Sequence, residues 1–98
     1  MNMNMLAQVQ KIQKDMEKKQ AEIQKSEYVG TSELVDITLY GSKKVKKVNI
    51  KINGSLEQDD VEILEDMIKI AMNDGISKIE KDIEDKMGVY GKALGGLM

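Results

Sequence analysis

Residues 34–54 read LVDITLYGSKKVKKVNIKING, and this stretch decides the fold. In its first half every second residue is Val, Ile or Leu, a period of two that predicts a half-buried strand over 34–40. A Gly-Ser turn follows, and a second alternation predicts a strand over 44–52. Val45 falls on the outward parity, so we expect a bulge or an edge position there. Two strands joined by such a short loop indicate an antiparallel hairpin.

The segments before this hairpin predict one more strand and a helix. Residues 28–31 are typical of a short strand that ends or bends at Gly30. Upstream, apolar residues recur three, four or seven positions apart from Met5 to Ile23, which predicts an amphipathic helix over 4–26. The apolar stripe is narrow and close to a 3.5-residue repeat. We therefore expect this helix to pack against another helix.

A long helix is predicted after the hairpin. Ser55 and Gln58 fit a capping box, with Ser55 as the N-cap of a helix that runs to about Met87. The first half of this helix has a wide apolar face, which predicts packing on the sheet. The second half narrows to a stripe suited to a helix partner. Gly75 lies where the width changes, and we expect a bend or a close contact there.

These elements predict an α+β fold in the order helix, three-stranded antiparallel sheet, helix. The chain has 98 residues, which allows a single small domain, and we place it at residues 1–88. Gly88 is expected to end the second helix. Residues 89–98 are rich in glycine and are predicted to be a flexible tail.

The lengths of the elements predict a homodimer. A helix of about 28 residues is about 42 Å long, whereas a three-stranded sheet is only about 14–15 Å across. The distal half of the second helix must project past the sheet, which leaves its apolar stripe without a cover in its own chain. A second copy is the economical cover. The predicted dimer interface consists of Ile76, Ile79, Ile83 and Met87.

The composition argues against an enzyme. The chain contains no His and no Cys, which removes the usual general base, the thiol nucleophile and the common zinc ligands. The acidic run from Glu57 to Asp66 lacks the spacing of a calcium loop. We predict no catalytic residue, metal, cofactor or small-molecule substrate. The sequence also shows no signal peptide and no apolar run of 18 residues, so we expect a cytoplasmic protein without a membrane span.

The net charge of −2 conceals an uneven distribution. Residues 1–26 and 27–54 each carry five Lys against three acidic residues, whereas residues 55–98 carry five Lys against eleven. All fifteen basic residues are Lys. Lysine is a point charge that suits phosphates and is poor at bidentate recognition of bases. A nucleic-acid contact would therefore rest on the phosphate backbone.

Three groups of lysines are candidate phosphate contacts. The two helical groups, whose members are three to five residues apart, are Lys11, Lys14 and Lys18 in the first helix and Lys78, Lys81 and Lys86 in the second. The hairpin group, a possible secondary contact through Lys43 and Lys44, also contains Lys46, Lys47 and Lys51. The alternative for the helical lysines is pairing with carboxylates one turn away. The alternative for the hairpin lysines is protection of an edge strand.

Three stretches, the second of which includes most of the hairpin, resemble a known protein family, and the resemblance covers nearly the whole chain. They are MLAQVQKIQKDMEKKQAEI, YVGTSELVDITLYGSKKVKKVNI and DDVEILEDMIKIAMNDGISKIEKDIEDKM. Together with the Gly-rich end, they resemble the YbaB/EbfC family of bacterial nucleoid-associated DNA-binding proteins. No single motif is specific, but their succession is. The proline usual at the Gly-rich end of the family is missing.

The resemblance implies a tweezer-like homodimer in the nucleoid that binds duplex DNA with little sequence preference and compacts it. It also favours the helices over the sheet as the DNA contact. The alternative is a protein-interaction module that partners DNA repair or replication factors and binds DNA weakly or not at all, since the acidic balance opposes DNA binding. A prefoldin-like chaperone subunit shares the element order, but its helices are much longer.

Overall fold

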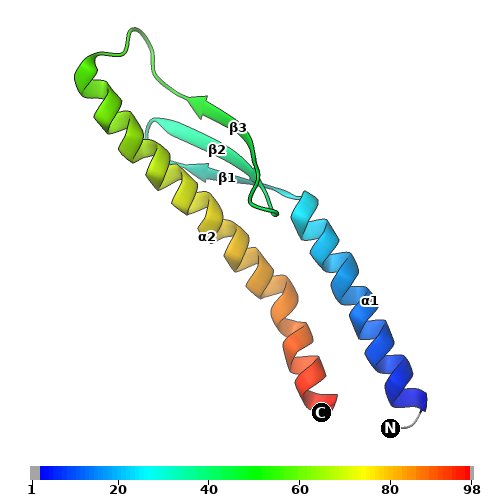
Figure 1. The fold of residues 1–98 in the computed structure, drawn as a ribbon. Helices are drawn as coiled ribbons and strands as arrows, with labels where there is room; N and C mark the ends of the chain where they lie inside the picture. The colour runs from blue at the N-terminus through cyan, green and yellow to red at the C-terminus, as the bar shows by residue number, and fades with distance from the viewer. Residues whose placement is uncertain (1–2, 98) are drawn as a thin grey trace.

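The structure, a computed structural model, describes residues 3–97, and the side chains of residues 3–90. Its elements are α1 (Met3–Lys25), β1 (Glu27–Thr31), β2 (Val35–Tyr40), β3 (Val45–Ile50) and α2 (Gln58–Leu97). The strands form one antiparallel sheet in the order β1-β2-β3, which confirms the predicted helix–sheet–helix fold. The molecule is extended, 69 × 19 × 13 Å, and α1 and the sheet lie on the same side of α2 (Figure 1).

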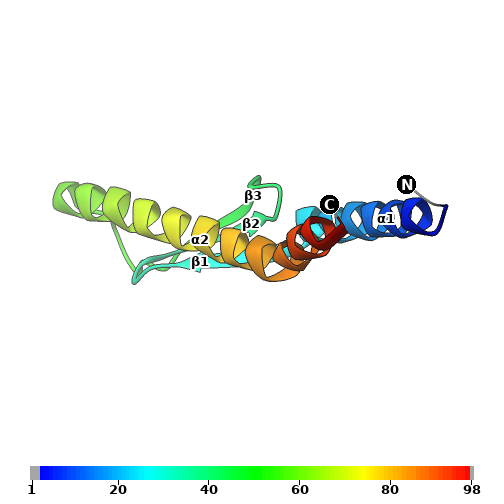
Figure 2. The ribbon, with the colours of Figure 1, turned by 90° about the horizontal axis from the view of Figure 1, so that it is seen from below.

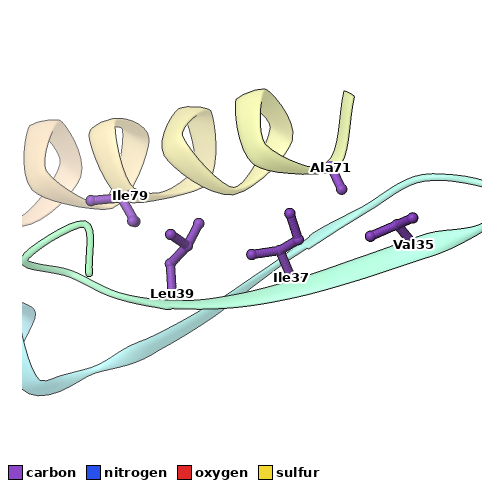
Figure 3. Close-up of a cluster of buried hydrophobic side chains, with 5 residues drawn as sticks. All are labelled: Val35, Ile37, Leu39, Ala71 and Ile79. Atoms are coloured by element: carbon purple, nitrogen blue, oxygen red, sulfur yellow. The ribbon is translucent and has the colours of Figure 1, made fainter. Parts of the chain in front are cut away.

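The core is a single layer between β2 and α2 (Figure 3). Val35, Ile37 and Leu39 alternate along β2, point toward α2 and are at most 2% exposed. Ala71 and Ile79 of α2 pack against them and are fully buried. Burial of each larger aliphatic side chain stabilises the fold by about 1.5–3 kcal/mol. The period of two that predicted the strand therefore also identifies the buried face.

β3 contains the irregularity that was expected at Val45. Thr38 pairs with Lys47, but the next residue of β2, Leu39, pairs with Val45. Lys46 is thus the extra residue of a β-bulge. The bulge confirms the prediction and returns Val45 to the face of the sheet that carries Leu39.

The inner face of β3 is uncovered, because α2 crosses the sheet over β1 and β2. In the part of the chain that the structure describes, α2 contacts β1 and β2 but not β3. Val45, Val48 and Ile50 face the same side as the core residues of β2, yet they are 44–48% exposed. We refer to these three side chains as the β3 face.

α2 begins two residues later than the predicted helix. Its first residue is Gln58, and the backbone N–H of Glu57 donates to Asp60 Oδ2 at 2.9 Å. Glu57 and Asp60 therefore form the cap, and the prediction of Ser55 as N-cap was wrong. Carboxylates close to the helix start are also favoured by the helix dipole.

The end of α2 was also mispredicted. The helix continues through Gly88 to Leu97 instead of ending near Met87. A glycine inside a helix costs only about 1 kcal/mol relative to alanine, and no proline follows to stop the helix. The segment 89–97 of the predicted tail is thus helical, and Met98 lies outside the described residues.

α1 packs on the distal half of α2, as its narrow stripe predicted. The stripe residues of α1 are half-buried, and Ile23 at the end next to the sheet is buried. The N–H of Gly41 in the β2–β3 turn donates to the carbonyl of Ser26 at 2.9 Å. This contact joins the end of α1 to the turn. α1 and α2 therefore form an arm that extends beyond the sheet (Figure 2).

The assumption behind the predicted dimer interface was wrong at Ile79. This side chain is fully buried against β2, so its own chain already covers it. Ile76 is half-buried. Ile83 and Met87 line a hollow between α1 and α2, together with Met16 of α1. Part of the stripe is therefore covered by α1, which the length argument did not anticipate.

Candidate nucleic-acid interface

α1 carries four exposed lysines on the side opposite its apolar stripe. At about 100° per residue, Lys11, Lys14, Lys18 and Lys25 fall within an arc of about 60° that is opposite the apolar stripe. From the first to the last they span about 21 Å along the helix axis. Among the described residues, none of the four has a carboxylate within ion-pair distance. We call these four residues the α1 lysine row.

Two of the three lysines predicted on α2 are paired with carboxylates one turn away. Lys78 Nζ lies 3.0 Å from Asp74 Oδ2, and Lys86 Nζ lies 3.0 Å from Asp82 Oδ2. The alternative of pairing along the helix is therefore what the structure shows for both. Lys81 is exposed and has no such partner among the described residues, and the three lysines are spread over about 140° of the helix. The structure does not bring them to one face.

The ion pair of Asp74 and Lys78 also forms hydrogen bonds with the backbone at the free edge of β1. Asp74 Oδ2 accepts a hydrogen bond from the backbone N–H of Thr31 at 2.9 Å, and Lys78 Nζ donates to the carbonyl of Val29 at 2.8 Å. The Thr31 hydrogen bond, followed by that of Lys78, lowers the pKa of Asp74 below its ordinary value. These contacts occupy backbone groups at the free edge of β1 that would otherwise bind water or the strand of another chain.

A third contact in the same row joins β1 to α2 through Tyr28. Its hydroxyl donates to Asp82 Oδ2, which also receives Lys86. Burial, followed by the hydrogen bond to Asp82, raises the pKa of Tyr28 to about 12. The Tyr28 hydrogen bond and then Lys86 lower the pKa of Asp82. Both shifts favour the state in which the phenol is protonated and the carboxylate is charged.

The spacing of these α2 residues is itself a signal in the sequence. Asp74, Lys78, Asp82 and Lys86 alternate in sign at intervals of four residues, which places them in one row of the helix. Such a row is typical of a helix face stabilised by its own ion pairs. Its strand partners depend on how α2 crosses β1, which periodicity does not determine.

Most hairpin lysines are also compensated. Three are paired with carboxylates, namely Lys43 with Glu80, Lys46 with Glu27 and Lys51 with Asp36, at 3.6, 2.8 and 3.1 Å. Lys46 Nζ also lies 5.9 Å from the centre of the Tyr40 ring. Lys44 and Lys47 are exposed and have no carboxylate partner within the described residues. Of the proposed secondary pair, only Lys44 is therefore uncompensated.

The unpaired lysines lie mainly in one layer of the molecule. α1 and the sheet stand on one side of α2 in Figure 1, and residues 1–54, which form this layer, carry ten Lys against six acidic residues. Residues 55–98, most of which form α2, carry five Lys against eleven. A polyanion is therefore attracted to the layer of α1 and the sheet and repelled by α2.

Within residues 3–97, no group of three or more His, Cys, Asp or Glu side chains is placed to hold a metal ion. None of the described helices has the length and apolar character needed to cross a bilayer.

Residues 1–94 match the YbaB/EbfC DNA-binding family. The chain belongs to this family. The match confirms the resemblance seen in the sequence, and it places the chain in a DNA-binding family that is not one of enzymes.

Relatives of this YbaB/EbfC family member are similar over nearly their whole length. A nucleoid-associated protein of Enterococcus faecalis is 38% identical over 94 residues, which is 94% of this chain and 89% of that protein. One from Streptococcus agalactiae serotype III is 40% identical over 93 residues, covering 92% of this chain and 93% of the relative. One from Lactococcus lactis subsp. lactis is 40% identical over 97 residues, covering 96% and 97%.

Proposed function

We propose that this YbaB/EbfC family member is a nucleoid-associated protein that binds duplex DNA as a homodimer and alters or compacts its conformation. The observation that carries the proposal is the α1 lysine row, four exposed positive charges on one helix face that have no carboxylate partner among the described residues. The relatives, which are named nucleoid-associated proteins, support the same function and a place in the nucleoid.

The chemistry of the row favours binding without sequence preference. Duplex DNA carries one negative charge per about 1.7 Å of helix axis, so a row of about 21 Å always meets several phosphates. Lysine lacks the planar fork with which arginine recognises guanine. We therefore expect scrambled and native duplexes to bind within about tenfold of each other, or roughly 1.4 kcal/mol.

The β3 face supports the homodimer. Its three aliphatic side chains are half-exposed, and on the first half of α2 Val61 and Ile68 are also exposed, by 46% and 38%. A second copy seated on this surface would bury all five side chains. Each chain would then contribute one α1 lysine row, so the dimer presents two rows to DNA. The interface we propose therefore lies at the sheet and the first half of α2. Ile76, Ile83 and Met87, which the sequence predicted as interface residues, would instead face α1 of their own chain or the arm of the partner.

A salt titration of a labelled duplex of about 30 base pairs tests the DNA contact. Each phosphate contact contributes about −0.9 to the slope of log K against log salt. The triple variant Lys11→Gln, Lys14→Gln and Lys18→Gln should flatten the slope while its far-UV circular dichroism stays unchanged. The comparison variant is Lys43→Gln with Lys44→Gln, which removes one compensated and one unpaired lysine. Loss of binding in the comparison variant alone would move the contact from α1 to the hairpin.

The second candidate is a protein-interaction module, and one observation favours it. Ile63 and Ile70, seven residues apart on acidic α2, are 48% and 47% exposed. An apolar pair with acidic neighbours suits a basic amphipathic helix of another protein. If the wild-type protein binds no duplex at about 50 mM salt, this candidate replaces DNA binding.

A further inference from the structure

The side of the sheet that faces away from α2 is a flat polar surface. The register that sends Val35, Ile37 and Leu39 toward α2 sends Thr38 and Tyr40 the other way. Lys47 pairs with Thr38, and Asn49 pairs with Asp36, so both lie on the same outward side. No described element packs on it, because α2 covers the inner side and α1 extends past the end of the sheet (Figure 1). We call this surface the outer sheet face.

The side chains of the outer sheet face suit phosphate oxygens. Thr38 and Tyr40 offer hydroxyls, Asn49 an amide and Lys47 an unpaired ammonium, and all of these groups are common phosphate donors in protein–DNA contacts. Val29 is the one large apolar side chain of the strands that is exposed on this side. The surface therefore differs in kind from the apolar β3 face on the other side of the sheet.

The two acidic residues on the outer sheet face are compensated. Glu27 holds Lys46 at 2.8 Å, and Asp36 holds Lys51 at 3.1 Å. The Thr31 side chain, followed by Lys51, lowers the pKa of Asp36, so this carboxylate stays charged and paired with Lys51. The ion pairs cancel the local repulsion of a polyanion, and Lys47 remains as excess positive charge.

The outer sheet face continues the α1 lysine row. Lys25 is the last residue of α1, and β1 begins two residues later at Glu27, which pairs with Tyr40. α1 and the sheet occupy one side of α2 (Figure 1), the row lies opposite the apolar stripe of α1, and the outer sheet face lies opposite the core. The row spans about 21 Å along α1, and the sheet extends about 10 Å from β1 to β3.

We propose that duplex DNA runs from the α1 lysine row onto the outer sheet face, where Lys25 and Lys47 hold phosphates and Thr38, Tyr40 and Asn49 add neutral hydrogen bonds. The proposal rests on the proposed DNA-binding function and extends its contact from the arm to the sheet. It also explains the separation of charge, because the DNA then lies on the side of the sheet that faces away from the acidic helix α2.

A pair of single substitutions tests this path. Lys47→Gln removes a phosphate contact, so the salt slope should fall by about 0.9 for each chain bound, whereas Lys47→Arg should retain it. The matched control is Lys69→Gln, which makes the same charge change on α2, where Lys69 is 70% exposed and 3.9 Å from Asp66. Equal slopes for Lys47→Gln and Lys69→Gln would overturn the proposal, as would a Lys47→Gln slope equal to that of the wild type.

Site-specific crosslinking provides a second readout that does not depend on affinity. The chain has no cysteine, so a single one can carry a photoreactive group. A label at Asn49→Cys should crosslink to bound duplex, and a label at Asn73→Cys, exposed on α2, should not. If the protein binds duplex but Asn49→Cys gives no crosslink, the path over the sheet is wrong while DNA binding through α1 stands. If the wild type binds no duplex at all, the proposed function fails first.

Discussion

Gly30 of β1 and Gly75 of α2 meet backbone to backbone where the long helix crosses the sheet. A methyl group added to Gly30 would lie 2.6 Å from the backbone nitrogen of Gly75 and even closer to the carbonyl oxygen of Ala71. A methyl group on Gly75 would meet the Leu39 side chain and lie 3.4 Å from Gly30 Cα. This crossing confirms the close contact predicted at Gly75. It draws α2 toward β1 and β2, and so leaves β3 uncovered.

The first prediction follows from this crossing. Gly30→Ala should destabilise the fold by about 1–3 kcal/mol or more, because the methyl group meets backbone atoms that cannot move aside independently. Gly88→Ala is the control, since nothing lies within 4 Å of its added methyl group and the position is inside α2. That substitution should stabilise the protein by up to about 1 kcal/mol. Urea denaturation measures both, and equal stability of the two variants would contradict the close approach.

The second prediction concerns the Tyr28 phenol, whose pKa burial and the Asp82 hydrogen bond raise from the ordinary 10.0 to about 12. The folded state then keeps a proton that the unfolded state releases, so this contribution to stability is complete below pH 10 and is lost as the pH rises toward 12. Ultraviolet difference titration should show one phenol that ionises near pH 12, and Tyr28→Phe should remove it. Asp82→Asn should bring the pKa part of the way back toward 10, because burial remains. A late phenol that persists in Tyr28→Phe would show that another tyrosine is responsible.

The third prediction concerns acid. Hydrogen bonds from β1 and lysine partners lower the pKa values of Asp74 and Asp82 below the ordinary 3.8. The stability they contribute is complete above that value and is lost as the pH falls through the lowered pKa values, because the unfolded state binds protons first. Replacing both with Asn should therefore make stability less dependent on pH below about 4. Urea midpoints at pH 6 and pH 3 measure this, and Glu62→Gln, an exposed acid without a partner among the described residues, is the control.

Periodicity predicted the elements that bury one face and failed where a single residue was used as a stop or start signal. The alternation along β2 identified the whole buried row, because a strand between helix and solvent has only two sides. Gly88 did not end α2, since glycine weakens a helix without removing a hydrogen bond. The cover of Ile79 was missed because helix length says how far α2 projects but not where it crosses the sheet.

The candidate DNA interface was likewise predictable from the sequence only in part. The α1 lysine row could be read from spacing, because its members share one face of one helix. The compensation of Lys78 and Lys86 follows from intervals of four along α2, and it is the pairing stated as the alternative for the helical lysines. The alternation along β2 and β3 indicates which residues lie on the polar side of the sheet. That α1 lies on the same side of α2 as the sheet could not be predicted from spacing, because it depends on how the elements pack (Figure 1).

The last prediction separates the dimer surface from the core. Val48 of the β3 face is 48% exposed in the single chain, so in Val48→Glu the carboxylate reaches water and the chain stays folded. In a dimer that covers the β3 face the same carboxylate would be buried without a partner, which costs several kcal/mol. Sedimentation equilibrium should therefore show a dimeric wild type and a folded, monomeric Val48→Glu. Asn49→Glu adds the same charge on the opposite side of the same strand and should remain dimeric. Ile79→Ala, in the core, should instead cost about 2–5 kcal/mol of folding free energy. A dimeric Val48→Glu would place the interface elsewhere, and a wild type that is monomeric at micromolar concentration would refute the homodimer itself.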